Sequence, residues 1–106
     1  MLWFSLKRSW KFFWQRKSRG WDDSDLWELD NNITDFILPR LKEFRKKIGS
    51  PPTGGMTLEE WKDILNKMII AFELNDNDET EWTEEEQKKY KEGMFLFAEY
   101  FQELWY

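Results

Sequence analysis

The chain of 106 residues contains no histidine, no cysteine and no valine. Without histidine and cysteine it cannot form a disulfide, a thiol nucleophile, a histidine general base or the usual structural zinc site. The absence of cysteine also fits a reducing, cytoplasmic compartment. We therefore expect no catalysis, and neither a metal nor another cofactor.

Long apolar runs and strand patterns are missing as well. No window approaches the roughly 20 apolar residues that a transmembrane helix needs. Near the N-terminus, charged residues interrupt the apolar run that a secretory signal would need. No stretch alternates apolar and polar residues as a half-buried strand does. The sequence therefore predicts an all-α protein, a single domain over residues 1–106 built as a small bundle of four or so helices.

Aromatic residues, in contrast, are abundant: eight Trp, nine Phe and three Tyr make up 19% of the chain. A core of this size can bury only part of them, so we expect some to contact a ligand, a partner or another copy of the chain. Their excess on the last predicted helix favours a homodimer or a larger homo-oligomer.

The net charge is −5, but the charges are unevenly distributed. Residues 1–20 contain six Lys or Arg and no acid, whereas residues 21–106 contain ten basic and 21 acidic residues, a net charge of −11. The acidic part would be repelled by nucleic-acid phosphates, so only the basic segment is expected to attract them.

Residues 1–19 are predicted to form a basic, aromatic helix or arm. Apolar side chains at helical spacing form one stripe, made of Trp3, Leu6, Trp10, Phe13 and Trp14. Most of the basic side chains lie away from this stripe. We expect the stripe to pack on the domain, and two alternatives stay open: docking on a membrane surface, or contact with nucleotides or a partner.

Residues 20–48 predict one long amphipathic helix, because apolar residues recur in steps of three and four. Asp22, Asp23 and Ser24 are candidate N-caps, and a glycine and two prolines end the helix. Pro39 removes a backbone N–H inside it, at a cost of about 3 kcal/mol or more. We therefore expect a kink at Pro39, or two helices that meet there at an angle.

Two further helices are predicted at residues 57–74 and 83–105. Each begins with a capping box, Thr57 with Glu60 and Thr83 with Glu86. Residues 49–56 form a connector, and residues 75–86 an acidic linker. The linker resembles a calcium loop only loosely, because a threonine stands where the loop needs a glycine.

The acidic residues near the start of the second helix are the only chemically suggestive cluster. Pairs of Asp can hold Mg²⁺ or transfer protons, yet most of these acids stand where helix capping alone would place them. Asp30 is the acid that capping does not explain, and Arg19 and Arg40 are its candidate ion-pair partners. A binding role is therefore favoured over catalysis.

Five short motifs follow one another in the chain: residues 19–30 (RGWDDSDLWELD), 37–41 (ILPRL), 57–61 (TLEEW), 67–69 (KMI) and 71–73 (AFE). In these motifs and their spacing, roughly residues 19–73 resemble a family of small tailed-phage proteins. The resemblance implies an early phage protein in the host cytoplasm, with inhibition of a host defence as a natural role.

In that setting we expect a non-catalytic protein that counters host antiviral immunity, by sequestering a nucleotide-derived signal or by blocking a defence protein. Guanidinium groups would hold phosphate, indole rings would stack on a base, and carboxylates would accept from a base edge or a sugar hydroxyl. The candidate ligand-binding residues are Arg16, Arg19, Trp21, Asp25, Trp27, Asp30 and Arg40.

Two alternatives compete with this hypothesis. In the structural one, Trp27 belongs to the core, the acids are helix caps, and Arg40 pairs with Asp30 or Asp35. In the functional one, the protein is a helical interaction or assembly protein, and residues 1–19 dock on a membrane or on nucleic acid.

Overall fold

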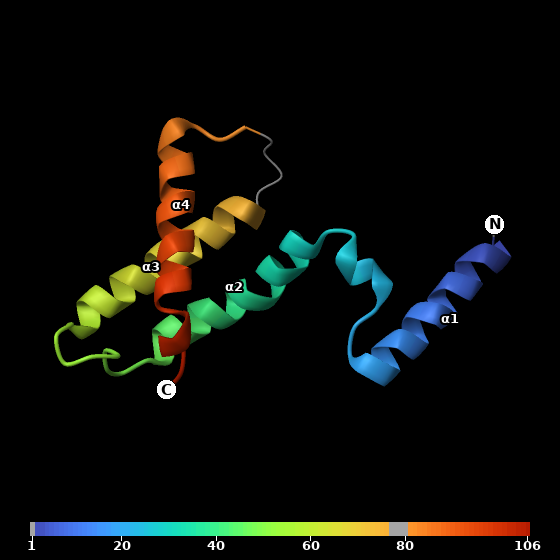
Figure 1. The fold of residues 1–106 in the computed structure, drawn as a ribbon, viewed down its shortest axis with the longest axis horizontal. Helices are drawn as coiled ribbons and strands as arrows, with labels where there is room; N and C mark the ends of the chain where they lie inside the picture. The colour runs from blue at the N-terminus through green and yellow to red at the C-terminus, as the bar shows by residue number, and fades with distance from the viewer. Residues whose placement is uncertain (1, 77–80) are drawn as a thin grey trace. The chain divides into compact units, whose positions relative to one another are not determined.

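The computed structural model describes residues 2–76 and 81–106, with side chains from residue 7 onward. All regular structure in these ranges is helical, which confirms the all-α fold with four α-helices (Figure 1). The chain divides into two compact units, residues 1–32 and residues 33–106. In chain order the elements are α1 (Leu2–Arg19), the 3₁₀ helix η1 (Asp23–Leu26), α2 (Leu29–Lys47), α3 (Leu58–Asp76), α4 (Glu84–Glu99) and the 3₁₀ helix η2 (Phe101–Glu103).

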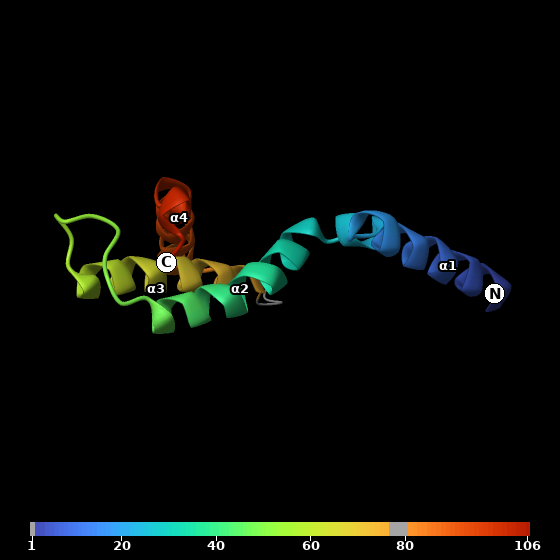
Figure 2. The same ribbon diagram turned by 90° about the horizontal axis from the view of Figure 1, so that it is seen from below.

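The larger unit is built around α3, which lies between α2 and α4 (Figures 1 and 2). Because α3 has neighbours on two sides, its apolar residues extend beyond a single stripe. Six of its side chains are buried, whereas α2 has two buried residues and α4 one. The buried apolar residues of this core are Leu41, Ile48, Trp61, Leu65, Met68, Ile69, Ala71 and Phe72.

Polar contacts fix α2 against α3 at both ends of their interface. Near one end the Arg45 Nε–H donates to the backbone oxygen of Lys62 at 3.0 Å. Near the other the Asn75 amide donates to the Oγ1 of Thr34 at 2.9 Å, and Thr34 is only 1% exposed. A buried hydroxyl requires a partner of this kind, so these contacts help to fix the register of the two helices.

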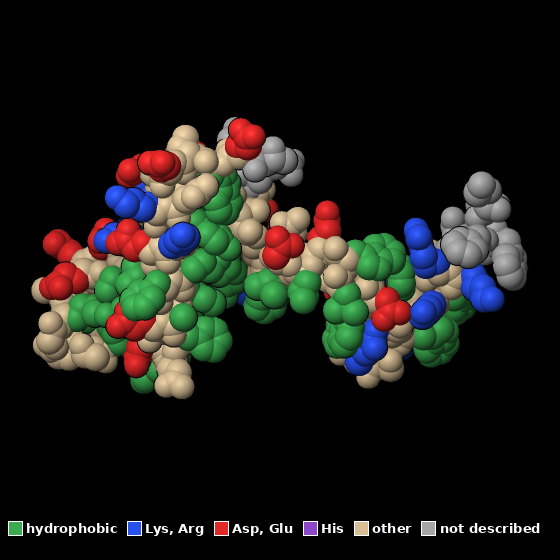
Figure 3. Space-filling model, turned by 45° about the horizontal axis from the view of Figure 1, so that its top comes forward, with side chains coloured by type: hydrophobic (Ala, Val, Ile, Leu, Met, Phe, Trp, Pro, Cys, Tyr) green, Lys and Arg blue, Asp and Glu red, His purple; other side chains and the backbone are tan. Residues whose placement is uncertain are grey.

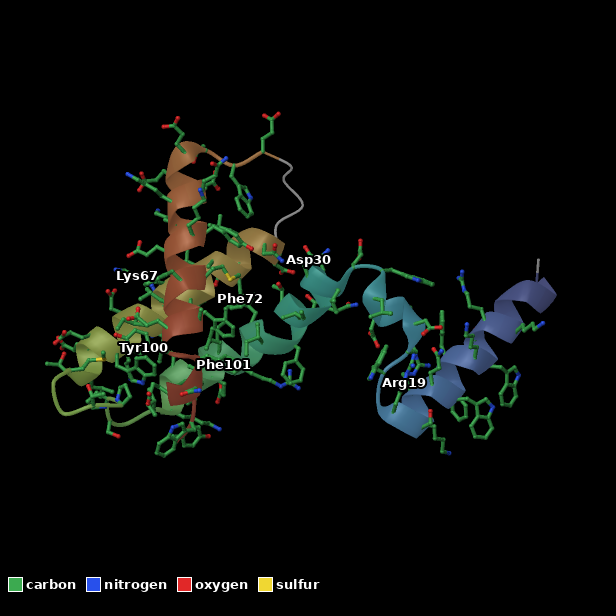
Figure 4. The ribbon with its side chains drawn as sticks, viewed as in Figure 1. Arg19, Asp30, Lys67, Phe72, Tyr100 and Phe101 are labelled. Carbon is green, nitrogen blue, oxygen red and sulfur yellow. The ribbon has the colours of Figure 1, made fainter. Side chains whose placement is uncertain are left out.

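The close packing of α4 on α3 depends on Gly93. A Cβ atom at this position would overlap the Ala71 Cβ and the backbone oxygen of Lys67. Nearby, the Lys67 ammonium pairs with Glu92 at 3.1 Å, where α4 crosses α3 (Figure 4). The Phe72 ring contacts that of Phe97 edge to face, with 5.0 Å between centroids. A residue without a side chain therefore allows the two helices to approach closely.

Both predicted capping boxes are confirmed. The Glu60 N–H donates to Thr57 Oγ1 at 3.1 Å, and the Thr57 N–H donates to the Glu60 carboxylate at 3.3 Å. Thr83 and Glu86 form the same reciprocal pair, at 3.1 and 3.0 Å. These local signals therefore place the starts of α3 and α4 correctly.

Several predicted helix bounds are wrong. The segment 20–48 is not one helix, because η1 ends at Leu26, a turn follows, and α2 begins only at Leu29. Short polar side chains compete with the helical backbone for hydrogen bonds, and here they close a separate 3₁₀ turn. The last helix ends at Glu99 and not at residue 105, because the chain tightens into η2.

Pro39 lies inside α2, which continues through it as one helix. The alternative of two separate helices that meet at Pro39 is therefore wrong, and the kink stays a prediction. α3 continues to Asp76, beyond the predicted end at residue 74. The loose calcium-loop match depends on residues 77, 79 and 80, which lie outside the described residues.

Candidate functional site

The smaller unit contains α1, η1 and the turn that joins them. Gly20 occupies this turn with φ of +84°, a conformation that side chains other than glycine rarely adopt. Its N–H donates to the backbone oxygen of Arg16 at 2.9 Å, which closes the C-terminus of α1. The chain then continues into an acidic turn beside the basic helix.

Asp22 is the centre of this turn and is only 2% exposed. Its carboxylate accepts hydrogen bonds from the backbone N–H and the hydroxyl of Ser24, and it pairs with the Arg16 guanidinium. Its own N–H donates to the Asp25 carboxylate at 2.9 Å, so Asp22 and Asp25 form a capping box. The bonds from Ser24 lower the pKa of Asp22, and Arg16 adds to the effect.

Asp23 binds three polar side chains of α1. The Gln15 side chain, whose Oε1 accepts a hydrogen bond from the Asp23 N–H at 2.8 Å, is the main cause that lowers the pKa of Asp23 from 3.8 to about 2, and Arg19 and Lys11 contribute. Arg19 Nη2 lies 2.9 Å and Lys11 Nζ lies 3.2 Å from the Asp23 carboxylate. Together with Arg16, these residues pair the basic side of α1 with acids of the same unit.

The aromatic stripe of α1 does not face this turn. Successive residues of an α-helix lie 100° apart around its axis. Lys11, Gln15 and Arg19 therefore lie on one side of α1, and Trp10, Phe13 and Trp14 lie on the other. Basic and hydrophobic side chains are exposed together on this unit (Figure 3). On the aromatic side Trp10 is 60% exposed, Phe13 44% and Trp14 58%.

The three rings form one continuous surface, which we call the aromatic face of α1. The Trp10 and Trp14 rings stack with 6.5 Å between centroids, and Phe13 contacts both of them edge-on. The Lys17 ammonium lies 5.4 Å from the Phe13 centroid. A shallow hollow of about 350 Å³ lies beside the rings, bordered by Ser9, Trp10, Phe13 and Arg16. The other predicted members of the stripe, Trp3 and Leu6, lie outside the described side chains.

The structure brings four of the predicted ligand-binding residues together around the acidic turn. Arg16 and Asp25 both bind Asp22, as described above. The Arg19 guanidinium lies 3.7 Å from the Trp21 ring centroid, and its Nε–H donates to the Trp21 carbonyl at 3.1 Å. Both arginines therefore already have acceptors within the protein, although the Trp21 ring is 42% exposed.

Trp27 is 63% exposed, so the structural alternative that places it in the core is wrong. One side of its ring contacts Phe12 of α1, at 5.6 Å between centroids, and the Arg8 guanidinium lies 5.5 Å away. Trp27 therefore serves as a support for α1 while most of its surface stays accessible.

The last two predicted residues lie on α2. Asp30 is exposed in its first turn (Figure 4). Arg40 belongs to the larger unit, where its Nη1–H donates to the Phe36 carbonyl at 2.8 Å and its guanidinium covers the Phe36 ring at 3.9 Å. The contacts of Arg40 are thus local ones along its own helix.

Sequence reasoning did not identify Asp22 and Gln15 as the residues that attach α1 to the turn. The spacing of Asp22 and Asp25 carries the signal for a capping box. No pattern in the sequence indicates the contact between Gln15 and Asp23, because it depends on how α1 folds back on the turn.

Two features are not found within the described residues, a membrane-spanning helix and a metal-binding cluster. No helix there is long and apolar enough to cross a bilayer. No group of three or more acidic side chains is arranged to hold a metal ion in those ranges. Comparisons with protein-family models, with curated proteins and with solved structures find no match to this chain.

Proposed function

We propose that this protein is a non-catalytic binding protein and that α1 is its docking element. One observation supports the proposal above the others: the basic side of α1 is bonded to the acidic turn, while the aromatic face of α1 is exposed. Exposed contiguous aromatic residues of this kind mark interaction surfaces.

The partner that fits this face best is a protein with an apolar groove. Trp10, Phe13 and Trp14 have the i, i+3, i+4 spacing of anchors that an amphipathic helix inserts into such a groove. Phosphate-rich partners fit less well, because residues 21–106 carry a net charge of −11 and three basic residues of α1 are already paired. Lys17, beside Phe13, would meet an acidic group at the rim of the groove.

The resemblance to small tailed-phage proteins gives this binding protein a setting. A phage protein that binds a host protein through one helix can block it by occupying its groove. We therefore propose that the partner is a host defence protein in the cytoplasm and that the function is to counter antiviral immunity.

Replacement of Trp10 and Trp14 by serine tests this function. Phage would be plated on hosts that carry individual defence systems, with the wild-type protein or the variant supplied in trans. We expect the wild type to restore plating against one system and the variant to lose this protection. The matched control is Phe95→Ser, which removes a 65% exposed aromatic residue of α4 and should still protect. Equal protection by the wild type and the Trp10/Trp14 variant would contradict the proposal.

Direct binding assays separate this function from docking on a membrane or on nucleic acid. The purified protein would be floated with phosphatidylglycerol vesicles and titrated with single-stranded DNA. We expect weak binding in both assays. Tight binding that the Trp10/Trp14 variant loses would instead support the assembly protein whose N-terminal helix docks on one of these surfaces.

Sequestration of a nucleotide-derived signal is the second candidate, and the hollow beside the aromatic face supports it. The Trp10 indole and the Phe13 phenyl ring border this hollow together with Arg16. Such rings can stack on a base, and a guanidinium can add a cation–π contact. A ligand at 100 times its dissociation constant adds about 2.7 kcal/mol of stability, which raises the melting temperature by roughly 10 °C for a domain this small. A thermal melt against cyclic oligonucleotides and ADP-ribose derivatives tests this, and a flat panel would remove the candidate for those ligands.

A further inference from the structure

The side of α4 that faces away from α3 carries an aromatic residue, Phe95, which is 65% exposed. On the opposite side, Gly93 packs against Ala71 of α3, and the Phe97 ring contacts the Phe72 ring. Gly93 and Phe97 are each two positions from Phe95, which is about 200° around the axis of an α-helix. Phe95 therefore points away from α3, on the side of α4 that the other described helices of the larger unit leave open (Figure 2).

Charged residues of opposite sign stand one helical turn before and after Phe95. Lys91 precedes it by four positions and Glu99 follows it by four, and both are exposed. Residues four apart form one ridge along a helix surface, so this ridge is basic, then aromatic, then acidic. Neither Lys91 nor Glu99 forms an ion pair with another residue in the part of the chain that the structure describes. The ridge is therefore complementary in charge to a copy of itself that runs in the opposite direction.

We propose that the chain forms a two-fold symmetric dimer in which the α4 ridges of two copies pack side by side and antiparallel. Helices of globular proteins most often pack by interlocking ridges of this i±4 kind. The two Phe95 rings meet at the two-fold axis, and Lys91 of each copy lies beside Glu99 of the other. A two-fold contact uses each residue twice, so one ridge supplies two ion pairs. A parallel arrangement would place like charges together, and the order of charges therefore selects the antiparallel one.

Analytical ultracentrifugation of the whole protein over a range of concentrations tests this dimer. A contact between two single helices is smaller than a standard interface, so we expect exchange of monomer and dimer with a dissociation constant on the order of 100 μM. Phe95→Ser should weaken the association roughly a hundredfold, because two rings lose an apolar contact. The Trp10/Trp14 serine variant should dimerise like the wild type, since the aromatic face of α1 takes no part. The dimer and the docking function therefore stand or fall separately.

Charge reversal shows whether the two ridges pair as proposed. Lys91→Glu and Glu99→Lys each place like charges together twice, so each should weaken the dimer by about tenfold or more. An equimolar mixture of these two variants should associate again, because a ridge with two acids then meets a ridge with two bases. Lys46→Glu reverses the charge of an exposed residue on α2 and is the matched control, which should associate like the wild type.

All the residues changed on α4 are exposed, so these variants should keep the circular dichroism spectrum of the wild type. Three results would overturn the proposal. The wild type could stay monomeric at about 1 mM, a concentration above the expected dissociation constant. Phe95→Ser could dimerise as tightly as the wild type, which would place the contact elsewhere. The mixture of Lys91→Glu and Glu99→Lys could associate no better than either variant alone.

Discussion

At the scale of single residues, Gly93 decides how closely α4 can approach α3. A helix-interior glycine is usually about 0.5–1 kcal/mol less favourable than alanine, so Gly93→Ala would stabilise an exposed helix. Here the added Cβ would overlap the backbone oxygen of Lys67 and lie 3.2 Å from its carbonyl carbon. Backbone atoms of a packed helix cannot move aside cheaply, so the steric cost should exceed the gain in helix propensity.

We predict that Gly93→Ala lowers the free energy of unfolding by about 1–3 kcal/mol, as overpacking of a core does. Urea denaturation followed by circular dichroism measures this change. Gly54→Ala is the matched control, since nothing lies within 4 Å of a Cβ at that position. Unchanged or increased stability of Gly93→Ala would show that the two helices do not pack as closely as described.

The residue scale also shows what sequence reasoning can reach. The capping boxes at Thr57 and Thr83 are confirmed because both partners lie within one helical turn, so local spacing contains all the information. The role of Gly93 and the bond between Thr34 and Asn75 connect residues that are far apart in the chain. The spacing of those residues in the sequence does not indicate either contact, so the sequence analysis predicts neither of them.

At the scale of helices, α1 shows what the periodicity of apolar residues can predict and what it cannot. The spacing of its apolar residues correctly predicts a helix with an aromatic face, but it does not tell which side meets a neighbour. The sequence predicts that the stripe packs on the domain; within the smaller unit Trp10, Phe13 and Trp14 are exposed, so the stripe has no apolar partner there, and its packing on the larger unit stays a prediction. Within its unit, α1 is attached by ion pairs and by the contact of Phe12 with Trp27, and its aromatic face takes no part.

This attachment predicts a pH dependence for the smaller unit. The pKa of Asp23 is about 2 in the folded protein and 3.8 ordinarily, because Gln15, Arg19 and Lys11 favour the charged form. A lowered pKa contributes stability that is fully present above the ordinary pKa and is lost as the pH falls through the folded value. The pKa of Asp22 is shifted in the same direction. We therefore expect α1 to loosen from the turn as the pH falls from about 4 to about 2.

The indole NMR signal of Trp27 reports this change, because its ring contacts Phe12 of α1. We expect it to shift with an apparent midpoint near the pKa of Asp23. Asp23→Asn is the matched control, since it removes the titrating group and should leave a weaker pH dependence that comes from Asp22. A signal with the same pH profile in both proteins would show that Asp23 does not hold α1 in place.

At the scale of the whole molecule, the two compact units differ in how they are stabilised. The larger unit has an apolar core whose buried residues lie between Leu41 and Phe72. The smaller one is held by charged and aromatic contacts around Asp22 and Asp23, with no fully buried apolar side chain among those described. The fold class followed from the sequence, because helix periodicity is local. The division into two units with different stabilising contacts did not follow from the sequence, because it depends on which apolar helix faces pack against another element.

The difference leads to a prediction for a truncated chain. A fragment of residues 29–106 retains α2 whole and every residue of the core, so we expect it to unfold cooperatively. Its melting temperature should lie within roughly 5 °C of that of the full chain, a difference worth about 1 kcal/mol in a domain of this size. Circular dichroism melts of both proteins measure this.

The substitution Leu65→Ala in both proteins is the decisive comparison. Leu65 is fully buried, so its truncation should cost about 2–5 kcal/mol. The cost should be equal in the fragment and in the full chain if residues 1–28 add nothing to the core. A fragment that melts without cooperativity, or a much smaller cost of Leu65→Ala in the fragment, would show that the core needs the N-terminal residues to fold. In that event the aromatic face of α1 would be needed to stabilise the core. It would then not be free for a partner, and the proposal that α1 is the docking element would be contradicted.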